Sequence, residues 1–192
     1  MGTMRSERAR DEVLQATADL VAEVGLERTT IDEIAARSGV AKTTIYRHWP
    51  TKQALLMAAV QGCLEYTPTP NTGDLRADLI ACFDHFIGAS VGSRVGKMLT
   101  SLLDGAARDP ELDRLLRAYM VDRSLPLRTV LQLAQYRGEL PADLDLHLAA
   151  ALFIGPISYR KTILREPITE EYVAAIVDAG LQALRAGALT SR

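Results

Sequence analysis

The residues best suited to chemistry in this sequence are four evenly spaced cations in a stretch without acids. Arg37, Lys42, Arg47 and Lys52 recur every five residues, and no Asp or Glu occurs from residue 34 to residue 64. Lys and Arg side chains without neighbouring carboxylates are suited to binding phosphate groups. The stretch is therefore suited to contact nucleic acid, and the alternative from charge alone is a solvated helical hairpin whose bases keep it soluble.

The other reactive side chains form no catalytic or metal-ligating pattern. His85 and His147 have no Cys, His or carboxylate partner at ligand spacing, and adjacent Asp84 and His85 would point about 100° apart on a helix. Cys63 and Cys82 match no metal or disulfide pattern and lie among apolar residues, which predicts buried thiols. We expect no catalytic residue, no metal and no cofactor.

The residues that must position the cations have the order of a helix-turn-helix. Thr30 and Glu33 have the spacing of a capping box, which starts a helix, and Gly39 supplies the tight turn after it. A short helix follows over residues 41–48, with Ile45 facing inward and Pro50 ending it. Before this pair, an apolar helix is expected between a cap at Ser6 and a stop at Gly25, and after it a helix from Lys52 to about Leu64 capped by Thr51.

A helix that enters the major groove of DNA presents its first residues to base edges and its flanks to phosphates. Lys42, Thr43, Thr44, Tyr46 and His48 are suited to these contacts, whereas Arg47 could face either solvent or the DNA backbone. Amides and hydroxyls at helix starts favour anions, which predicts phosphate contacts near Thr29, Thr30 and Lys52. The predicted DNA-binding residues are therefore Thr29, Thr30, Lys42, Thr43, Thr44, Tyr46, Arg47, His48 and Lys52.

Residues 9–55, centred on TTIDEIAARSGVAKTTIYRHWPTKQAL, resemble the N-terminal DNA-binding domain of the tetracycline-repressor (TetR) family of bacterial transcription regulators. Two departures are visible, Trp49 for the usual Phe and Gln53 for the usual acid. Trp49 is still an aromatic plug, and we expect Gln53 to point into solvent. The resemblance implies a homodimer that binds a double-stranded DNA operator, most often as a repressor, and is released by a small-molecule effector.

The rest of the chain predicts helices only, so the expected fold class is all-α. Apolar stripes at helical spacing cover residues 79–87, 95–106 and 112–120, with a break at Pro126. The proline-rich segment 67–73 reads as a loop. We expect a helix-turn-helix domain over residues 1–53 and a helical effector-binding and dimerisation domain over residues 54–192, with the helix that starts at Lys52 coupling the two.

An effector site is expected between the helices of this second domain, because helical bundles place small-molecule sites there. Few aromatic and many aliphatic residues favour an apolar effector. Arg123 and Arg160 could fix a polar or acidic group on it, but pairing with acids at the surface is favoured for each, and most of the large apolar residues are expected to be simple core. The candidate contacts are Phe83, Phe86, Met98, Leu102, Tyr119, Met120, Arg123, Tyr136, Phe153 and Tyr159.

The last two predicted helices, over residues 143–165 and 169–186, carry a large apolar surface. Residues 148–157 are apolar almost all round, and a stripe of Val173, Ile176, Val177, Leu181 and Leu184 follows. A helix that is apolar all round is buried on more than one face, so we expect both helices to pair with their copies in a dimer.

Composition supports a cytoplasmic protein that does not contact a membrane. The N-terminus MGTMRSERARDE is too charged for a signal peptide, and the longest apolar run is far shorter than the ~20 residues of a membrane span. Residues 1–53 hold eight Lys or Arg and eight Asp or Glu, so a nucleic-acid surface must come from the arrangement of charges. The alternative is a helical enzyme or ligand-binding protein that uses the C-terminal cavity without DNA.

Overall fold

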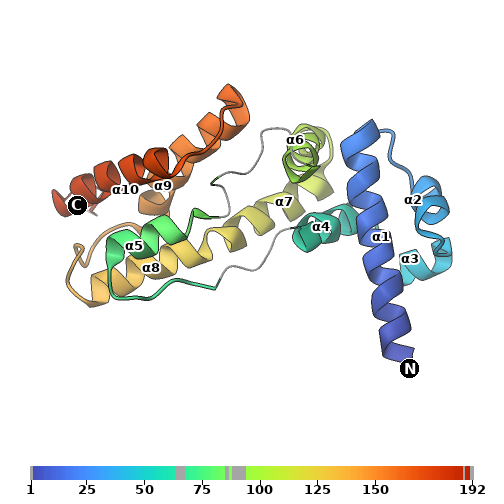
Figure 1. The fold of residues 1–192 in the computed structure, drawn as a ribbon, viewed down its shortest axis with the longest axis horizontal. Coiled ribbons are helices and arrows are strands. Elements are labelled where there is room, and N and C mark those ends of the chain that lie inside the picture. The colour runs from blue at the N-terminus through green and yellow to red at the C-terminus, as the bar shows by residue number, and fades with distance from the viewer. Residues whose placement is uncertain (1, 64–67, 85–86, 88–93, 188, 191–192) are drawn as a thin grey trace. The chain divides into compact units, whose positions relative to one another are not determined.

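The computed structural model describes residues 2–63, 68–84, 87, 94–187 and 189–190, with side chains from residue 6 onward. The described residues are mainly helical, as predicted (Figure 1). Within these ranges β pairing is limited to two isolated bridges, Ile87 with Ile168 and Leu144 with Thr190. None of the described helices has the length and apolarity needed to cross a membrane.

The first of two compact units contains residues 1–66 and 92–120. Its helices are α1 (Gly2–Val24), α2 (Ile31–Ser38), α3 (Lys42–His48), α4 (Lys52–Cys63), α6 (Arg94–Ala106) and most of α7 (Pro110–Arg123). Helix α1 contacts α2, α4 and α6. The predicted cap at Ser6 is wrong, because α1 already begins at Gly2 and Ser6 lies inside it.

Two hydrophobic cores meet along α1 and α4 in this unit. One joins Val13 and Leu20 of α1 to Ile34, Ile45, Trp49 and Leu55. The other joins Ala18 and Val21 of α1 to the next residues of α4, Leu56, Met57, Ala59 and Val60, and to apolar residues of α6 and α7. Helix α4 therefore packs on the helix-turn-helix with one face and on α6 and α7 with another.

The second unit contains residues 67–91 and 121–192. Its elements are α5 (Leu75–Ala81), α8 (Leu125–Tyr136), α9 (Leu146–Ser158), the π-helix η2 (Tyr159–Leu164) and α10 (Glu170–Arg185). The predicted break near Pro126 is confirmed, because α7 ends at Arg123 and α8 begins at Leu125. The helix predicted over residues 79–87 is too long, since α5 ends at Ala81.

Helices α9 and α10 pack closely because one of them carries a glycine at the contact. A Cβ on Gly180 would lie 2.3 Å from Cε1 of Phe153, so only glycine lets the Phe153 ring rest on α10. The stripe on α10 faces this core, where Val173, Val177 and Leu184 have no exposed surface. The prediction that this stripe forms a dimer interface is therefore wrong: it is covered within one chain.

Candidate nucleic-acid interface

The helix-turn-helix is defined by capping and turn residues that are close together in sequence. Thr30 caps α2 with its hydroxyl accepting from the N–H of Glu33, and the carboxylate of Glu33 accepts from the N–H of Thr30. Gly39 has a φ of 69°, in the left-handed region that glycine adopts without strain, and ends α2. The predicted capping box and turn are both confirmed.

Helix α3 has one apolar face and one polar face. Ile45 is completely buried and Trp49, one turn later, is 7% exposed, so both anchor α3 in the core shared with α1 and α4. The remaining side chains of α3 project outward or lie partly exposed: Lys42, Thr43, Thr44, Tyr46, Arg47 and His48. This is the arrangement that a DNA-reading helix requires, a rigid apolar anchor behind a row of hydrogen-bonding groups.

Two of the four evenly spaced cations already have partners on the same unit. Lys42 forms an ion pair with Asp32, and Arg37 lies 2.8 Å from Glu23. Hydrogen bonding from Arg37 holds the pKa of the Glu23 carboxyl below its usual value. Because exposed ion pairs contribute only about 0–1 kcal/mol, DNA phosphates can compete for these cations at small cost.

The two threonines before α2 differ in accessibility. Thr30 is exposed, but its hydroxyl bonds to the Glu33 carboxylate in the capping box, so a phosphate would have to replace that contact. Thr29 is fully buried, and its hydroxyl donates to the carbonyl of Gly25 at 2.8 Å. The Thr29 side chain therefore does not present its hydroxyl to a phosphate, and we leave it out of the proposed interface.

Lys52 begins α4, as predicted, and is partly buried. Its ammonium donates to the carbonyl of Leu26 at 2.9 Å. Burial lowers the pKa of Lys52, while the charges of Glu33 and Asp109 raise it. An ammonium has three N–H donors, so two remain for a phosphate.

Gln53 does not point into solvent, contrary to the sequence-based expectation. Its amide donates to Asp109 at 2.5 Å, and the neighbouring Thr51 donates to Glu111 at 2.9 Å. The same Asp109 caps α7 by accepting from the N–H groups of Glu111 and Leu112. These bonds hold the pKa of Asp109 below its usual value, chiefly through Gln53.

The start of α4 is thereby tied to the turn between α6 and α7. Leu26, whose carbonyl holds Lys52, packs where a Cβ on Gly105 of α6 would lie only 2.1 Å from its Cδ2. Arg108 adds an ion pair to Glu27 at 3.1 Å. The sequence analysis missed these contacts, and the one available signal was the replacement of an acid by Gln53.

The predicted effector residues do not gather at one site. Met98, Leu102 and Tyr119 are buried in the core of the first unit, whereas Phe83 and Phe153 are buried in that of the second. Met120, Tyr136 and Tyr159 are exposed, Arg123 is partly exposed, and Phe86 lies outside the described residues. Two described cavities, of about 280 and 210 Å³, are both in the first unit and include none of these residues.

The described residues contain no group of three or more His, Cys, Asp or Glu side chains that could hold a metal ion. Cys63 and Cys82 are free thiols, and each is partly buried. Burial raises the pKa of Cys82 to about 12, so this thiol is protonated and unreactive at neutral pH.

Comparisons with known proteins cover nearly the whole chain. Residues 13–59 match the family model of bacterial regulatory proteins of the tetR family, and residues 69–179 match that of the tetracyclin repressor-like C-terminal domain. The HTH-type transcriptional regulator Rv1556 of Mycobacterium tuberculosis is 34% identical over 169 residues, which are 87% of this chain and 83% of that protein. YdeS of Bacillus subtilis, also an HTH-type transcriptional regulator, is 29% identical over 98% of this chain and 96% of its own length.

A solved structure gives the same result. The TetR family transcription regulator SCO0332 superposes with a TM-score of 0.69 at 32% identity, covering 91% of this chain and 97% of its own. The similarity to this structure therefore extends over most of both chains.

Proposed function

This chain belongs to the TetR family of bacterial transcriptional regulators, and we propose that it is a repressor that leaves its operator when a small molecule binds. Members of the family bind DNA operators and usually dimerise, and they are regulators rather than enzymes. The enzyme alternative is therefore set aside. The observation that supports DNA reading most directly is α3, which is anchored by Ile45 and Trp49 and presents polar and basic side chains outward.

We assign base contacts to Lys42, Thr43, Thr44, Tyr46 and His48, and phosphate contacts to Thr30, Arg47 and Lys52. The first group projects from the helix proposed to lie in the major groove, where such side chains can reach base edges. The second group lies at the ends of α2, α3 and α4, where the sugar–phosphate backbone borders the groove.

The predicted cytoplasmic location remains a prediction.

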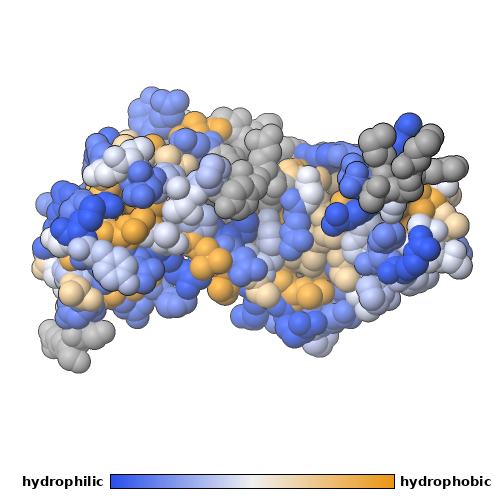
Figure 2. Space-filling model, turned by 90° about the horizontal axis from the view of Figure 1, so that it is seen from below, coloured by the Kyte–Doolittle hydropathy of each residue, from blue (hydrophilic) through white to orange (hydrophobic). Residues whose placement is uncertain are grey.

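For the dimer we propose the outer face of α9 and η2. Leu148, Leu152, Tyr159 and Ile163 follow one another at spacings of four, seven and four residues, which places them on one side of the helix. They are 50%, 38%, 55% and 65% exposed. On the face drawn in Figure 2, orange apolar patches lie among blue polar side chains. Contiguous exposed apolar side chains are typical of protein–protein interfaces.

The contacts of α4 offer a path by which effector binding could change DNA binding. Thr51 and Gln53 bond to Glu111 and Asp109, so a shift of the α6–α7 turn would pull on the start of α4. Because Leu55 and Leu56 of α4 belong to different cores, the same shift would reach α3. An effector moves this equilibrium only if it binds the two states unequally.

We propose an apolar effector held by the helical region after residue 54. Its cores are dominated by aliphatic residues, with Phe83 and Phe153 as aromatic members of one of them. The candidate contacts from the sequence remain proposals, since the buried ones become accessible only if the helices separate.

Base reading by α3 is tested with Thr44→Ala and Tyr46→Ala. Each should lower affinity for the operator more than for random DNA, by about 1–3 kcal/mol, because a lost base contact removes discrimination. The operator is first selected from a random duplex library with the unmodified protein, and affinities are then measured by fluorescence anisotropy.

Tyr136→Ala is the matched control, because Tyr136 is 78% exposed on α8. Equal losses on operator and random DNA would assign Thr44 and Tyr46 to phosphate contacts instead. If the unmodified protein selected no sequence from the library, specific DNA recognition itself would be disproved.

The phosphate contact of Lys52 is tested through salt. Lys52→Ala should weaken binding equally on all sequences and reduce the slope of log K against log salt by about one unit. Lys97→Ala removes an exposed lysine of α6 and should leave the slope unchanged. Since Lys52 also holds Leu26, thermal unfolding of the variant is recorded in parallel. An unaltered slope in a folded Lys52→Ala protein would restrict Lys52 to holding that turn.

A further inference from the structure

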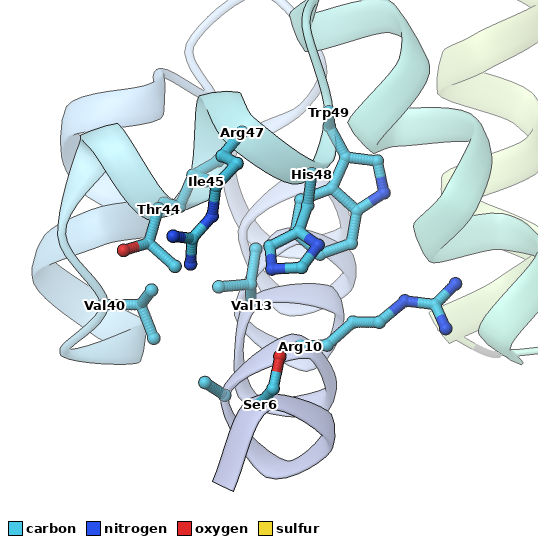
Figure 3. A pocket seen from close by; sticks show the side chains of 10 residues that line it. Ser6, Arg10, Val13, Val40, Thr44, Ile45, Arg47, His48 and Trp49 are labelled. Atoms are coloured by element: carbon cyan, nitrogen blue, oxygen red, sulfur yellow. The ribbon is translucent and has the colours of Figure 1, made fainter. Parts of the chain in front are cut away.

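A cavity of about 280 Å³ lies between the first half of α1 and the end of α3. Ser6, Ala9, Arg10 and Val13 line it from α1 at helical spacing, opposite Val40 and residues 44–49. Figure 3 shows the Ser6 hydroxyl and the side chains of Arg47 and His48 directed into this space, with Arg10 running out along its edge. Val13 and Ile45 form an apolar floor and are almost fully buried.

The charges around the cavity are all of one sign. Its charged lining residues are Arg10 and Arg47, His48 adds an imidazole, and no Asp or Glu lines it. Several other cations of this unit pair with carboxylates, for example Arg8 with Glu12 at 3.1 Å. Among the described residues, Arg10 and Arg47 have no ion-pair partner. Two unpaired guanidinium groups beside an apolar floor favour an anion, because the buried floor weakens the screening of their charge.

We propose that Ser6, Arg10, Arg47 and His48 form a phosphate-binding notch that grips the DNA backbone beside the recognition helix. This extends the DNA contacts to α1, which the sequence analysis assigned only a packing role. The inference rests on the proposed function, since α3 must lie in the groove for its far end to meet the backbone. At about 280 Å³ the cavity lies just below the ~300–1,000 Å³ of typical small-molecule sites, which favours a phosphate over an effector.

The test uses the full chain and a matched pair of arginines on one helix. Arg10→Ala removes a cation that lines the cavity, and Arg8→Ala removes a cation of the same helix that does not line it. Arg10→Ala should reduce the salt slope of binding by about one unit on operator and random DNA alike, and Arg10→Ala with Arg47→Ala by about two. Arg8→Ala should leave it unchanged. Ser6→Ala should lower the affinity for operator and random DNA by the same factor without changing the salt slope.

The outcomes separate the notch from the proposed function. If the unmodified protein binds its operator but Arg10→Ala and Arg8→Ala have equal slopes, the notch is wrong and DNA recognition by α3 stands. If the unmodified protein binds no duplex, the proposed function fails first. Free phosphate is the other source of the same chemistry, so inorganic pyrophosphate is titrated into DNA-free protein at constant ionic strength. The proposal would be overturned if Arg10→Ala abolished pyrophosphate binding but left the salt slopes for DNA unchanged. The ligand of the notch would then be a free anion and not the DNA backbone.

Discussion

Replacing Leu148 and Leu152 together with glutamate is expected to convert the protein to a monomer and to weaken operator binding by about 10²–10⁴-fold. Both leucines lie on the exposed face of α9, so the glutamates are solvated in the single chain and leave its core intact. In a dimer the same face is buried against its copy, where four carboxylates would be desolvated and would repel one another. The loss of affinity follows because the two recognition helices would no longer bind as one bivalent unit.

Light scattering gives the oligomeric state, circular dichroism the fold, and anisotropy the affinity for a full operator and for a half-site. Half-site affinity should stay close to that of the unmodified protein, since α3 is untouched. Leu125→Glu is the control, because Leu125 is 48% exposed on α8. A dimeric double variant would exclude the α9 face, and a monomeric Leu125→Glu protein would move the interface to α8.

The helix-turn-helix could be predicted closely because its signals are local. The capping box of Thr30 and Glu33, the left-handed Gly39 and the cap of Thr51 on Ala54 act within four residues, so neighbours in sequence decide them. Ile45 is at the only strongly apolar position of a seven-residue helix, and its burial followed from that. The exposed side of α3, and with it most of the candidate DNA contacts, could therefore be read directly.

The errors concern partners that are distant in sequence. The periodicity of α10 correctly indicated one apolar face, but periodicity does not say whether the same chain or a second copy covers it. The close contact between Gly180 and Phe153 shows that the same chain covers the α10 stripe, because it packs α9 directly on α10. Gln53 was assigned to solvent for the same reason: its partner Asp109 is 56 residues away, and nothing local announces it.

The effector site could not be predicted from residue types. Large apolar side chains both fill cores and line ligand sites, so their type alone does not separate the two roles. Met98 and Leu102 pack with α1 and α4, and Phe153 packs on Gly180, each fully covered by protein. Where an effector enters depends on how the helices separate, which is set by the free energies of two conformations.

Val177→Asp is expected to destabilise the second unit rather than to separate a dimer. Val177 has no exposed surface and packs in the core formed by α5, α8, α9 and α10. An aspartate there would bury a carboxylate without a partner, at a cost of about 4 kcal/mol or more, which lowers Tm by roughly 10 °C in a chain of this length. Thermal unfolding followed by circular dichroism measures the effect.

Ala179→Asp, two residues along the same helix at an exposed position, should change Tm by only a few degrees. The pair discriminates between the two roles of α10, because a core substitution lowers Tm at any protein concentration, whereas an interface substitution acts through dissociation that depends on concentration. If Val177→Asp kept its Tm and instead lost its dimer at micromolar concentration, the α10 stripe would be an intersubunit surface after all. The packing of Phe153 on Gly180 argues against that result, since the covered side of α10 faces α9 of the same chain.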